Sequence, residues 1–345
     1  MKENKGLFWL VGVAAFVLII AGLKAASQIV VPFMLSVFIA IICTPLLGTL
    51  SRRNIPTWLS IIVIVVLIMI CLTFVGLLVG ASLDDFTKQL PTYRERFGVE
   101  MSGLLEKLST FGINISYQQI RDYADPSALM SLFTNTLTSL GSVLTNMFLV
   151  IMTVVFILFE AAEVPKKLAY ALGDATNSMD KVNQFIDTVN RYLMIKTLIS
   201  LATGLIIGLW LWFLGVDFPI LWGVSAFLLN FIPNIGSIIA AVPAVLLAFV
   251  QLGSLHAGLT GLGFLAVNLI MGNFIEPKFM GRGVGLSPLV VFLSLILWGW
   301  VFGPVGMLLS IPLTIIIKIA LEASPRMYWL AIMIDSKAHD QNKET

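Results

Sequence analysis

Long runs of apolar residues alternate with shorter polar segments along this chain. Four runs of roughly 20 residues, the length of an α-helix that crosses the hydrocarbon core of a bilayer, cover about 7–23, 28–50, 58–83 and 138–159. Two longer apolar blocks follow, over about 197–276 and 284–322. A β-barrel would instead show short segments of alternating polarity. The pattern therefore predicts an all-α integral membrane protein.

The polar segments between these runs divide the chain further. Residues 84–137 hold short amphipathic patterns, which predict a small helical domain outside the membrane. Residues 161–196 combine basic residues with apolar positions at helical spacing, which predicts an amphipathic helix at the cytoplasmic surface. The predicted divisions are three N-terminal membrane helices (1–83), the small extracytoplasmic helical domain (84–137), a membrane helix (138–160), the cytoplasmic amphipathic segment (161–196), a C-terminal membrane region with broken helices (197–322) and a cytoplasmic tail (323–345).

Basic residues in short loops indicate the orientation, because such residues are enriched on the cytoplasmic side of a membrane. The orientation that satisfies this rule places both chain ends in the cytoplasm. It leaves Lys24 and residues 84–136 outside. The basic positions assigned to the cytoplasm are Lys2, Lys5, Arg52, Arg53, those of 160–196, Lys278, Arg282 and those of the C-terminal tail.

Gly, Pro and Asn repeatedly interrupt the apolar sequence of the last third. The segments 216–251 and 284–320 each contain a turn signal near the middle, at 233–236 and 303–306 respectively. Each segment is either two short spans or one re-entrant hairpin that enters and leaves by the same face. Lipid offers no hydrogen-bond partner to a broken backbone, so such breaks occur where protein or a wet cavity surrounds them. Broken membrane helices mark the binding sites of transporters, which makes transport the favoured function.

Composition narrows the class of protein. The chain is 58% hydrophobic and only 12% charged, and its mean hydropathy is +0.97. A net charge of +2 is too small to indicate a nucleic-acid partner. The two cysteines, Cys43 and Cys71, both lie inside apolar runs, which supports neither a disulfide framework nor a thiolate metal site. The sequence contains no catalytic, metal or nucleotide-binding constellation, so we expect no enzyme activity and no cofactor.

Polar and turn-forming residues at the first break are the candidates for binding a solute. Asparagine and serine side chains within apolar helices can hydrogen-bond a hydroxylated molecule. Capping of the broken helices and contacts between helices are the alternative interpretation. The candidate substrate-binding residues are Asn230, Pro233, Asn234, Gly236, Ser237 and Asn273.

Charged and flexible residues follow at 276–288. Glu276 precedes a proline and has two cations nearby in sequence, so it is a candidate gate residue, with a solvated loop cluster as the alternative. Lys196, Asp217 and Lys318 lie near the ends of apolar runs and are interpreted as interfacial anchors. The candidate gate residues are Glu276, Lys278 and Arg282. The candidate hinge residues are Gly281, Gly283, Gly285 and Pro288.

Several of these motifs carry a resemblance to a known family. The chain resembles the autoinducer-2 exporter (AI-2E) family over nearly its whole length. The less specific matches are Ile29–Phe33, Leu90–Arg94 and Leu193–Thr197. The most specific matches are Trp222–Gly223, Asn230–Ser237, Gly272–Pro277, Met280–Gly283, Gly285–Ser287 and Leu297–Met307.

The resemblance implies a bacterial inner-membrane protein with about eight hydrophobic segments. It also implies export of the quorum-sensing signal autoinducer-2 or a similar small polar solute. The lipid bilayer and further copies of the chain, in a homo-oligomer that the family suggests is a pentamer, are then its partners. Other branches of the family resemble sodium(lithium)/proton antiporters, and this is the first alternative. The central parts of the apolar runs carry no Asp or Glu, which argues against ion exchange. A non-transporting scaffold whose 84–136 segment binds a partner is the second alternative.

Overall fold

A computed structural model of the chain describes residues 5–110, 147–172, 176–233, 235–280, 285–322 and 327–335. Every regular element in these ranges is a helix, as the hydrophobic pattern predicts. The N-terminal helices are α1 (Lys5–Ala25), α2 (Ser27–Arg52), α3 (Thr57–Thr110), α6 (Met147–Leu172) and α7 (Thr176–Leu214). The C-terminal helices are α8 (Pro219–Leu229), α9 (Ile235–Leu252), α10 (Ser254–Leu269), the π-helix η1 (Ile270–Ile275), α11 (Glu276–Met280), α12 (Pro288–Leu308), α13 (Ser310–Glu322) and α14 (Tyr328–Ile334).

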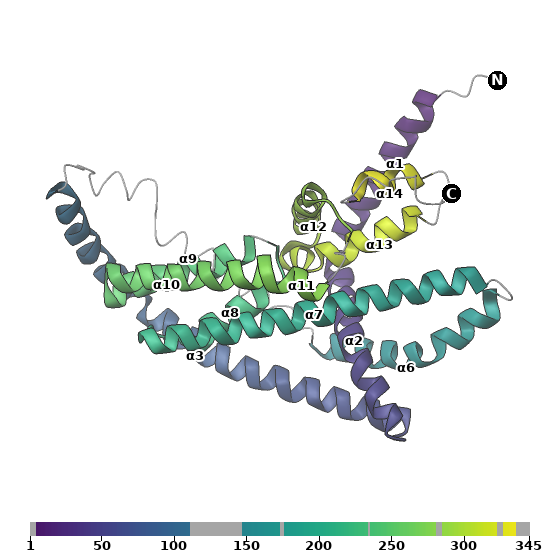
Figure 1. Cartoon of the computed structure of the whole chain (residues 1–345), viewed down its shortest axis with the longest axis horizontal. Coiled ribbons are helices and arrows are strands. Elements are labelled where there is room, and N and C mark those ends of the chain that lie inside the picture. The colour runs from purple at the N-terminus through teal and green to yellow at the C-terminus, as the bar shows by residue number, and fades with distance from the viewer. Residues whose placement is uncertain are drawn as a thin grey trace. The chain divides into compact units, whose positions relative to one another are not determined.

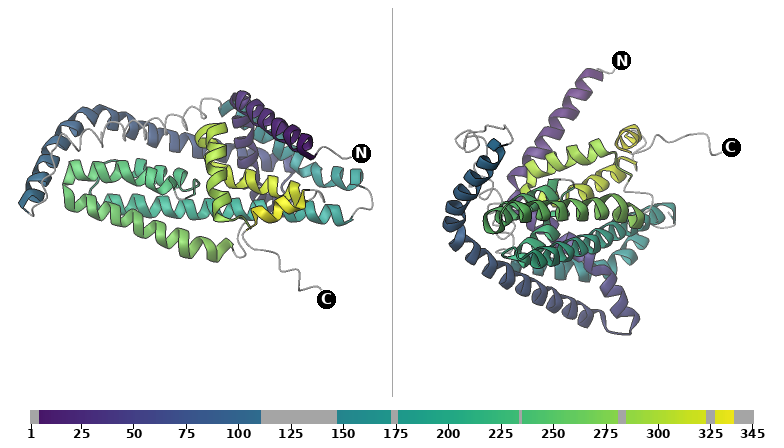
Figure 2. Two further views of the ribbon diagram at one scale, coloured as in Figure 1. Left: turned by 90° about the horizontal axis from the view of Figure 1, so that it is seen from above. Right: turned by 60° about the vertical axis from the view of Figure 1, so that its left-hand side comes forward.

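The helices form two compact units. Unit 1 comprises Met1–Ile61, Ser142–Phe185 and Leu286–Thr345, and unit 2 comprises Ile62–Gly141 and Ile186–Gly285. Unit 2 contains most of α3 and α7 together with α8, α9, α10, η1 and α11. Figures 1 and 2 show α9 and α10 running alongside each other within this unit, joined by the short turn at Gly253.

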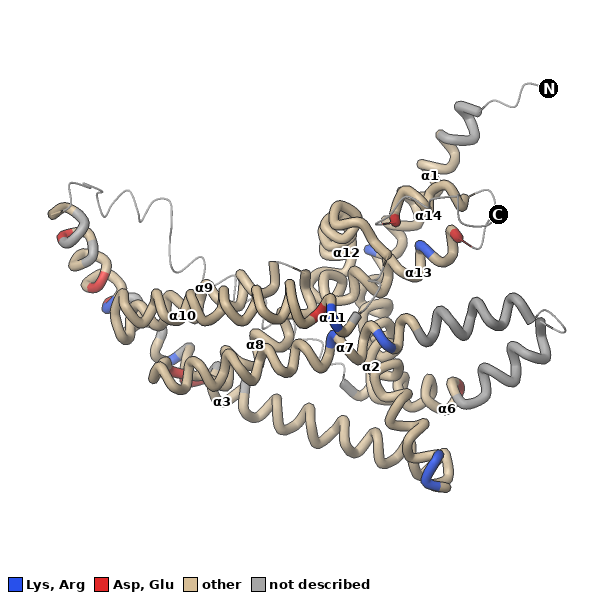
Figure 3. The backbone as a smooth tube through the Cα atoms, in the orientation of Figure 1, with Lys and Arg blue, Asp and Glu red and all other residues tan. Residues whose placement is uncertain are grey.

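Six helical segments in the described residues are long and apolar enough to cross a membrane, and three shorter apolar helices accompany them. Many of their large apolar side chains point outward; Leu209 and Phe213 on α7 are examples. Such surfaces are stable against lipid and unfavourable against water. Charged residues are absent from α9, α10 and η1 and reappear at α11, as Figure 3 shows. The structure agrees with an all-α membrane protein.

Three predicted boundaries, after residues 83, 160 and 196, fall inside the continuous helices α3, α6 and α7. The third apolar run and the first part of the predicted 84–137 domain form one helix, because α3 continues to Thr110 with Pro91 inside it. Residues 111–146, which include the rest of that domain, lie outside the described residues. Similarly, α7 carries the end of the predicted 161–196 amphipathic segment directly into the next apolar run.

The first broken segment is a helical hairpin. Its two ends lie together, because the side-chain oxygen of Gln251 accepts a hydrogen bond from the backbone N–H of Asp217 at 2.9 Å. The amide nitrogen of the same side chain donates to the carbonyl of Gly215 at 3.1 Å. Helix α8 has 11 residues and is therefore about 16 Å long, about half the thickness of the hydrocarbon core. The two ends of the segment thus lie at one edge, with α8 too short to cross the hydrocarbon core and α9, at 18 residues, long enough to do so.

The second broken segment, in unit 1, has the same design. Helix α12 is kinked at Gly303, whose φ of 67° and ψ of −149° are non-helical. Its two arms are joined across the hairpin by a hydrogen bond of 3.2 Å from the indole N–H of Trp298 to the hydroxyl of Thr314. At the base, the backbone N–H of Ser287 bonds the carbonyl of Ile334 at 3.0 Å. Asp335, the next residue, pairs with Lys318 of α13 at 2.9 Å.

One glycine packs tightly after each break. A Cβ atom at Gly236 would collide with the carbonyl of Leu229 on the preceding helix. A Cβ atom at Gly306 would collide in the same way with the carbonyl of Trp298. The returning arm of each hairpin therefore needs glycine for close backbone approach, and this requirement explains the shared spacing of turn signals in the sequence.

Candidate functional site

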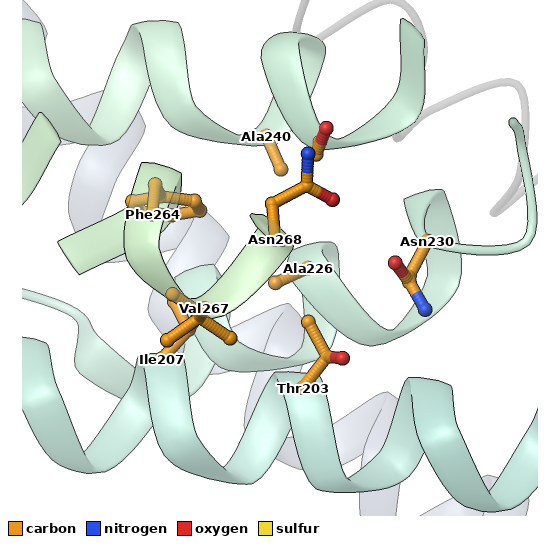
Figure 4. A pocket seen from close by; sticks show the side chains of 9 residues that line it. Thr203, Ile207, Ala226, Asn230, Ala240, Phe264, Val267 and Asn268 are labelled. Atoms are coloured by element: carbon orange, nitrogen blue, oxygen red, sulfur yellow. The ribbon is translucent and has the colours of Figure 1, made fainter. Parts of the chain in front are cut away.

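A small cavity lies beside the tip of the first hairpin, within unit 2. Helices α7, α8, α9 and α10 and the residue that ends α8 each contribute to its wall. The space open to the centre of a water-sized sphere is ≈ 10 Å³, about the minimum for one water molecule. Figure 4 shows the lining side chains, which are those of Thr203, Ile207, Ala226, Asn230, Ser237, Ala240, Phe264, Val267 and Asn268.

Glycines allow the walls of this cavity to come together. A Cβ atom at Gly204 of α7 would lie 2.6 Å from the carbonyl oxygen of Gly223 on α8. A Cβ atom at Gly223 would in turn lie 2.9 Å from the carbonyl oxygen of Gly204. The backbones of α7 and α8 are therefore in direct contact, which is the usual role of small residues spaced four apart in membrane helices. Gly208 completes this spacing on α7.

The four polar lining residues, Thr203, Asn230, Ser237 and Asn268, come from α7, the end of α8, α9 and α10. Asn230, at the end of α8, donates its side-chain N–H to the hydroxyl of Ser200 on α7 at 2.9 Å. Thr203, less than a turn further along α7, is buried and donates to the carbonyl of Ile199 at 2.9 Å. Asn268 of α10 is partly buried and faces the same space (Figure 4). The nine lining residues include no charged side chain, so the cavity is suited to uncharged polar groups.

A buried ion pair lies along the same helix α7. The ammonium of Lys196 contacts both carboxylate oxygens of Glu276 on α11, at 3.0 and 2.9 Å. The side chain of Lys196 is only 6% exposed and that of Glu276 is 22% exposed. Lys196, Ser200 and Thr203 are separated by four and three residues, so they share one face of α7. The ion pair and the cavity therefore occupy the same side of this helix.

A second polar contact ties α3 to the base of the hairpin. The hydroxyl of Tyr93 lies 2.9 Å from a carboxylate oxygen of Asp217 and 2.7 Å from the side-chain oxygen of Gln89, and the charged carboxylate is the stronger acceptor of its one proton. Burial and this hydrogen bond to a carboxylate raise the pKa of the Tyr93 phenol above its ordinary range. Phe86 lies about two turns before Tyr93 on α3. Its ring makes edge-on contacts with Phe218 and Trp222, at centroid distances of 5.9 and 5.8 Å. The part of α3 beyond its apolar run is thus packed on the start of α8.

The structure brings together some of the residues predicted to bind a solute. Asn230 and Ser237 both line the cavity. Pro233 lies in the turn between α8 and α9, and Gly236 makes the tight backbone contact described above. Asn273 is exposed on η1. Asn234 lies outside the described residues.

The predicted gate is organised differently from the sequence expectation. The partner that the structure gives Glu276 is Lys196, 80 residues earlier in the chain, whereas Lys278 is exposed. Gly285 has a positive φ of 64°, and Pro288 is the first residue of α12. The remaining predicted gate and hinge residues, Arg282, Gly281 and Gly283, lie outside the described residues.

Sequence reasoning missed the contribution of α7 to this site. It interpreted Lys196 as an interfacial anchor and assigned no role to Ser200 or Thr203. A signal was present, because three polar residues at helical spacing interrupt one face of a helix that is otherwise apolar over this stretch. The partner of each polar residue could not be read from that spacing.

Comparisons with known proteins agree with this architecture. The model of the AI-2E family transporter matches residues 13–326. The chain is 41% identical over 339 residues to the AI-2 transport protein TqsA of Escherichia coli strain K12, covering 98% of this chain and 97% of the relative. It is also 41% identical over 332 residues to a putative transport protein of Haemophilus influenzae, with 94% and 95% of the two chains covered. The putative transport protein YhhT of Escherichia coli strain K12 is 37% identical over 332 residues, with 96% and 95% covered. The chain therefore belongs to the AI-2E family of transporters.

Proposed function

We propose that this transporter exports autoinducer-2, or a similar small polar solute, across the bacterial inner membrane. A relative that shares 41% identity over almost the full length of both chains is named for AI-2 transport. The observation that carries the proposal is the cavity beside the tip of the first hairpin, whose mainly apolar wall includes four polar side chains. Its lining combines carboxamide and hydroxyl groups with apolar side chains and contains no charge, which suits a compact, hydroxylated and uncharged molecule.

The cavity holds about one water molecule, so the observed conformation is closed. Binding a larger solute requires the hairpin to move away from α7 and α10. Asn230, Asn234 and Ser237 would then hydrogen-bond the solute, while Pro233 and Gly236 shape the turn that carries them. Hydrogen bonds to these groups would replace some of those that the solute makes with water, which lowers the free-energy cost of removing its hydration shell.

Contacts within unit 2 support one orientation. The Tyr93–Asp217 contact places the far part of α3 at the same end as the hairpin base. The Lys196–Glu276 contact lies away from that base, because Lys196 is near the middle of α7 and Glu276 begins α11, beyond α10 and η1. Assigning the side of this second contact to the cytoplasm agrees with the distribution of basic residues in short loops. The first hairpin would then enter from outside, and both chain ends would be cytoplasmic, as part of a homo-oligomer of the kind the family suggests.

Solute flux from proteoliposomes tests the proposal. Purified protein would be reconstituted with labelled autoinducer-2 inside, and efflux would be followed with and without sodium or proton gradients. Replacing Thr203 by Val and Asn268 by Leu removes two polar groups from the cavity. We expect efflux to fall by about tenfold for each lost hydrogen bond, since one bond contributes about 1–1.5 kcal/mol.

Thr197→Val is the matched control for this experiment. Thr197 is also on α7 and also donates to the carbonyl four residues earlier, at 2.7 Å, but it does not line the cavity. Efflux equal to that of the unchanged protein is expected for this variant. Equal efflux in the cavity variants as well would contradict the proposed site.

Sodium(lithium)/proton antiport is the second candidate function. The buried Lys196–Glu276 pair favours it, because ionisable groups inside membrane helices often carry ions or protons. Antiport predicts that adding the cation restores the quenched fluorescence of a pH-sensitive dye in everted vesicles. This recovery should be lost in Glu276→Gln. Robust exchange together with absent autoinducer-2 efflux would make antiport the function of this chain.

A further inference from the structure

The Lys196–Glu276 pair is a poor choice if its only role is to stabilise the fold. Removing two charges from water carries a desolvation penalty that their mutual attraction often fails to repay. Lys196 is almost fully buried, and both of its contacts are to the same carboxylate. Apolar residues of similar size would hold α7 against α11 at lower cost. An ion pair in this position is better suited to a contact that must form in one conformation and break in another.

The pair lies about two helical turns along α7 from the residues that line the cavity. Ser200, which accepts the hydrogen bond from Asn230, is one helical turn from Lys196 and thus about 6 Å further along α7. Thr203, which lines the cavity, is about 10 Å along the same face. On the other side of the seam, Asn268 lines the cavity and Glu276 follows it by eight residues. The ion pair therefore links α7 to α11 about 10 Å along α7 from the cavity-lining residue Thr203.

The π-helix η1 separates the cavity from the carboxylate. Helix α10 carries Asn268, η1 occupies Ile270–Ile275, and Glu276 is the next residue. A π-turn accommodates one residue more than an α-turn, and such turns are common at functional sites. Successive residues of an α-helix are about 100° apart around its axis. Return of η1 to α-helical geometry would therefore rotate Glu276 by about 100° and separate it from Lys196.

We propose that the Lys196–Glu276 ion pair is a latch that closes the cavity at the α7–α11 seam, and that the π-turn of η1 is the element that releases it. The latch rests on the proposed function, because it controls access to the cavity through which the solute passes. In the latched state the seam is shut and the cavity is water-sized. In the released state α11 turns away from α7, and water and solute reach Thr203 and Asn230 from that end.

Accessibility of a cavity cysteine tests the latch directly. The reporter is Ser237→Cys, a substitution of similar size at a lining position, in a background with Cys43→Ala and Cys71→Ser. The rate of its modification by a charged, water-soluble methanethiosulfonate would be measured in the reconstituted protein. Glu276→Gln should raise this rate at least tenfold. The charge exchange, Lys196→Glu with Glu276→Lys, should bring the rate back to within about threefold of the parent, because the attraction is restored.

A matched control comes from the ion pair between Lys318 and Glu322, whose atoms are 3.7 Å apart and whose carboxylate is more exposed. Glu322→Gln removes one carboxylate as Glu276→Gln does, and it should leave the modification rate unchanged. An unchanged rate in Glu276→Gln would overturn the proposal. A raised rate that the charge exchange fails to lower would also overturn it, because the pair itself would then not be the cause.

Hydrogen exchange on the unsubstituted protein covers the case in which a variant fails to fold. Backbone amides of 270–280 should exchange at least tenfold faster than those in the middle of α10, since η1 and α11 must open to release the latch. Equal protection of the two segments would refute a releasable latch. Neither measurement uses autoinducer-2. Faster modification without autoinducer-2 efflux would therefore keep the latch and refute the proposed solute.

Discussion

The contact between α7 and α8 predicts opposite outcomes for two glycines on one helix face. Gly204 and Gly208 lie four residues apart on α7, and both face α8. A Cβ atom at Gly204 would lie 2.6 Å from the carbonyl oxygen of Gly223 and 2.8 Å from the Cβ of Phe227. A Cβ atom at Gly208 would lie 3.4 Å from its nearest neighbour, which is ordinary contact. Alanine should therefore be tolerated at Gly208 and should force the helices apart at Gly204.

The magnitude follows from the size of the collision. The contact at Gly204 is short by roughly 0.8 Å relative to an ordinary one. Both partners belong to helix backbone or to the stem of a side chain, so rotamer changes cannot relieve it. Overpacking of this kind costs about 1–3 kcal/mol. Both substitutions gain the same helix propensity of about 1 kcal/mol, and this term cancels when the two variants are compared.

Thermal unfolding in detergent measures the difference. We expect the midpoint of Gly204→Ala to lie roughly 2–8 °C below that of Gly208→Ala, which corresponds to the difference in free energy of unfolding. Efflux should fall in Gly204→Ala as well, because α8 carries Ala226 and ends at Asn230, both of which line the cavity. Equal midpoints for the two variants would show that α7 and α8 do not touch along these glycines.

Three further predictions concern side-chain hydrogen bonds. Tyr93→Phe should destabilise the protein by about 1.5–3 kcal/mol near neutral pH, because the lost bond is to the Asp217 carboxylate. The pKa of Tyr93 is raised in the folded state, so its stabilisation is complete below the unfolded pKa of about 10. This stabilisation is lost as the pH rises above about 10. A difference in unfolding midpoint between Tyr93→Phe and the parent protein that does not shrink above about pH 10 would contradict this prediction. Thr314→Val leaves the indole N–H of Trp298 without its acceptor and should lower the free energy of unfolding by about 1–3 kcal/mol, measured by chemical denaturation. Gln251→Leu removes both bonds at the base of the first hairpin, and we expect faster hydrogen exchange in α8 with no change in α12.

The fold could be predicted from the sequence where a single physical requirement decides the structure. Lipid demands about 20 apolar residues for each helical span, so the first three spans were located to within a few residues, whereas the two C-terminal apolar blocks were not divided into single spans. The break at 233–236 was also visible, because glycine and proline have few other roles inside a membrane helix. The end of α3 was not, since a helix can leave the membrane without any break and Asp84 is as compatible with a helix as with a loop. Polarity marks where a helix leaves lipid, and it does not mark where the helix ends.

The candidate site was harder to predict from the sequence, because its residues come together only through tertiary contacts. Asn230 and Ser237 stand out individually as polar residues beside a break, and both line the cavity. Lys196 and Glu276 were also visible, yet each was interpreted with its neighbours in sequence. Their pairing across 80 residues depends on the packing of α11 against α7 and on the register set by η1. A single sequence contains neither piece of information.

The two hairpins differ in how their polar groups are used, and this difference indicates where the solute is handled. In the second hairpin the hydroxyls of Ser294 and Ser310 bond carbonyls of the same arm, and Thr314 accepts from Trp298. These bonds hold the arms in place and lie within the hairpin itself. In the first hairpin, Asn230 reaches out to a different helix. A hydrogen bond between separate helices can be exchanged for one to a solute when the helices part, whereas bonds within one hairpin travel with it. We therefore expect movement of the first hairpin, rather than of the second, to expose polar groups to the solute.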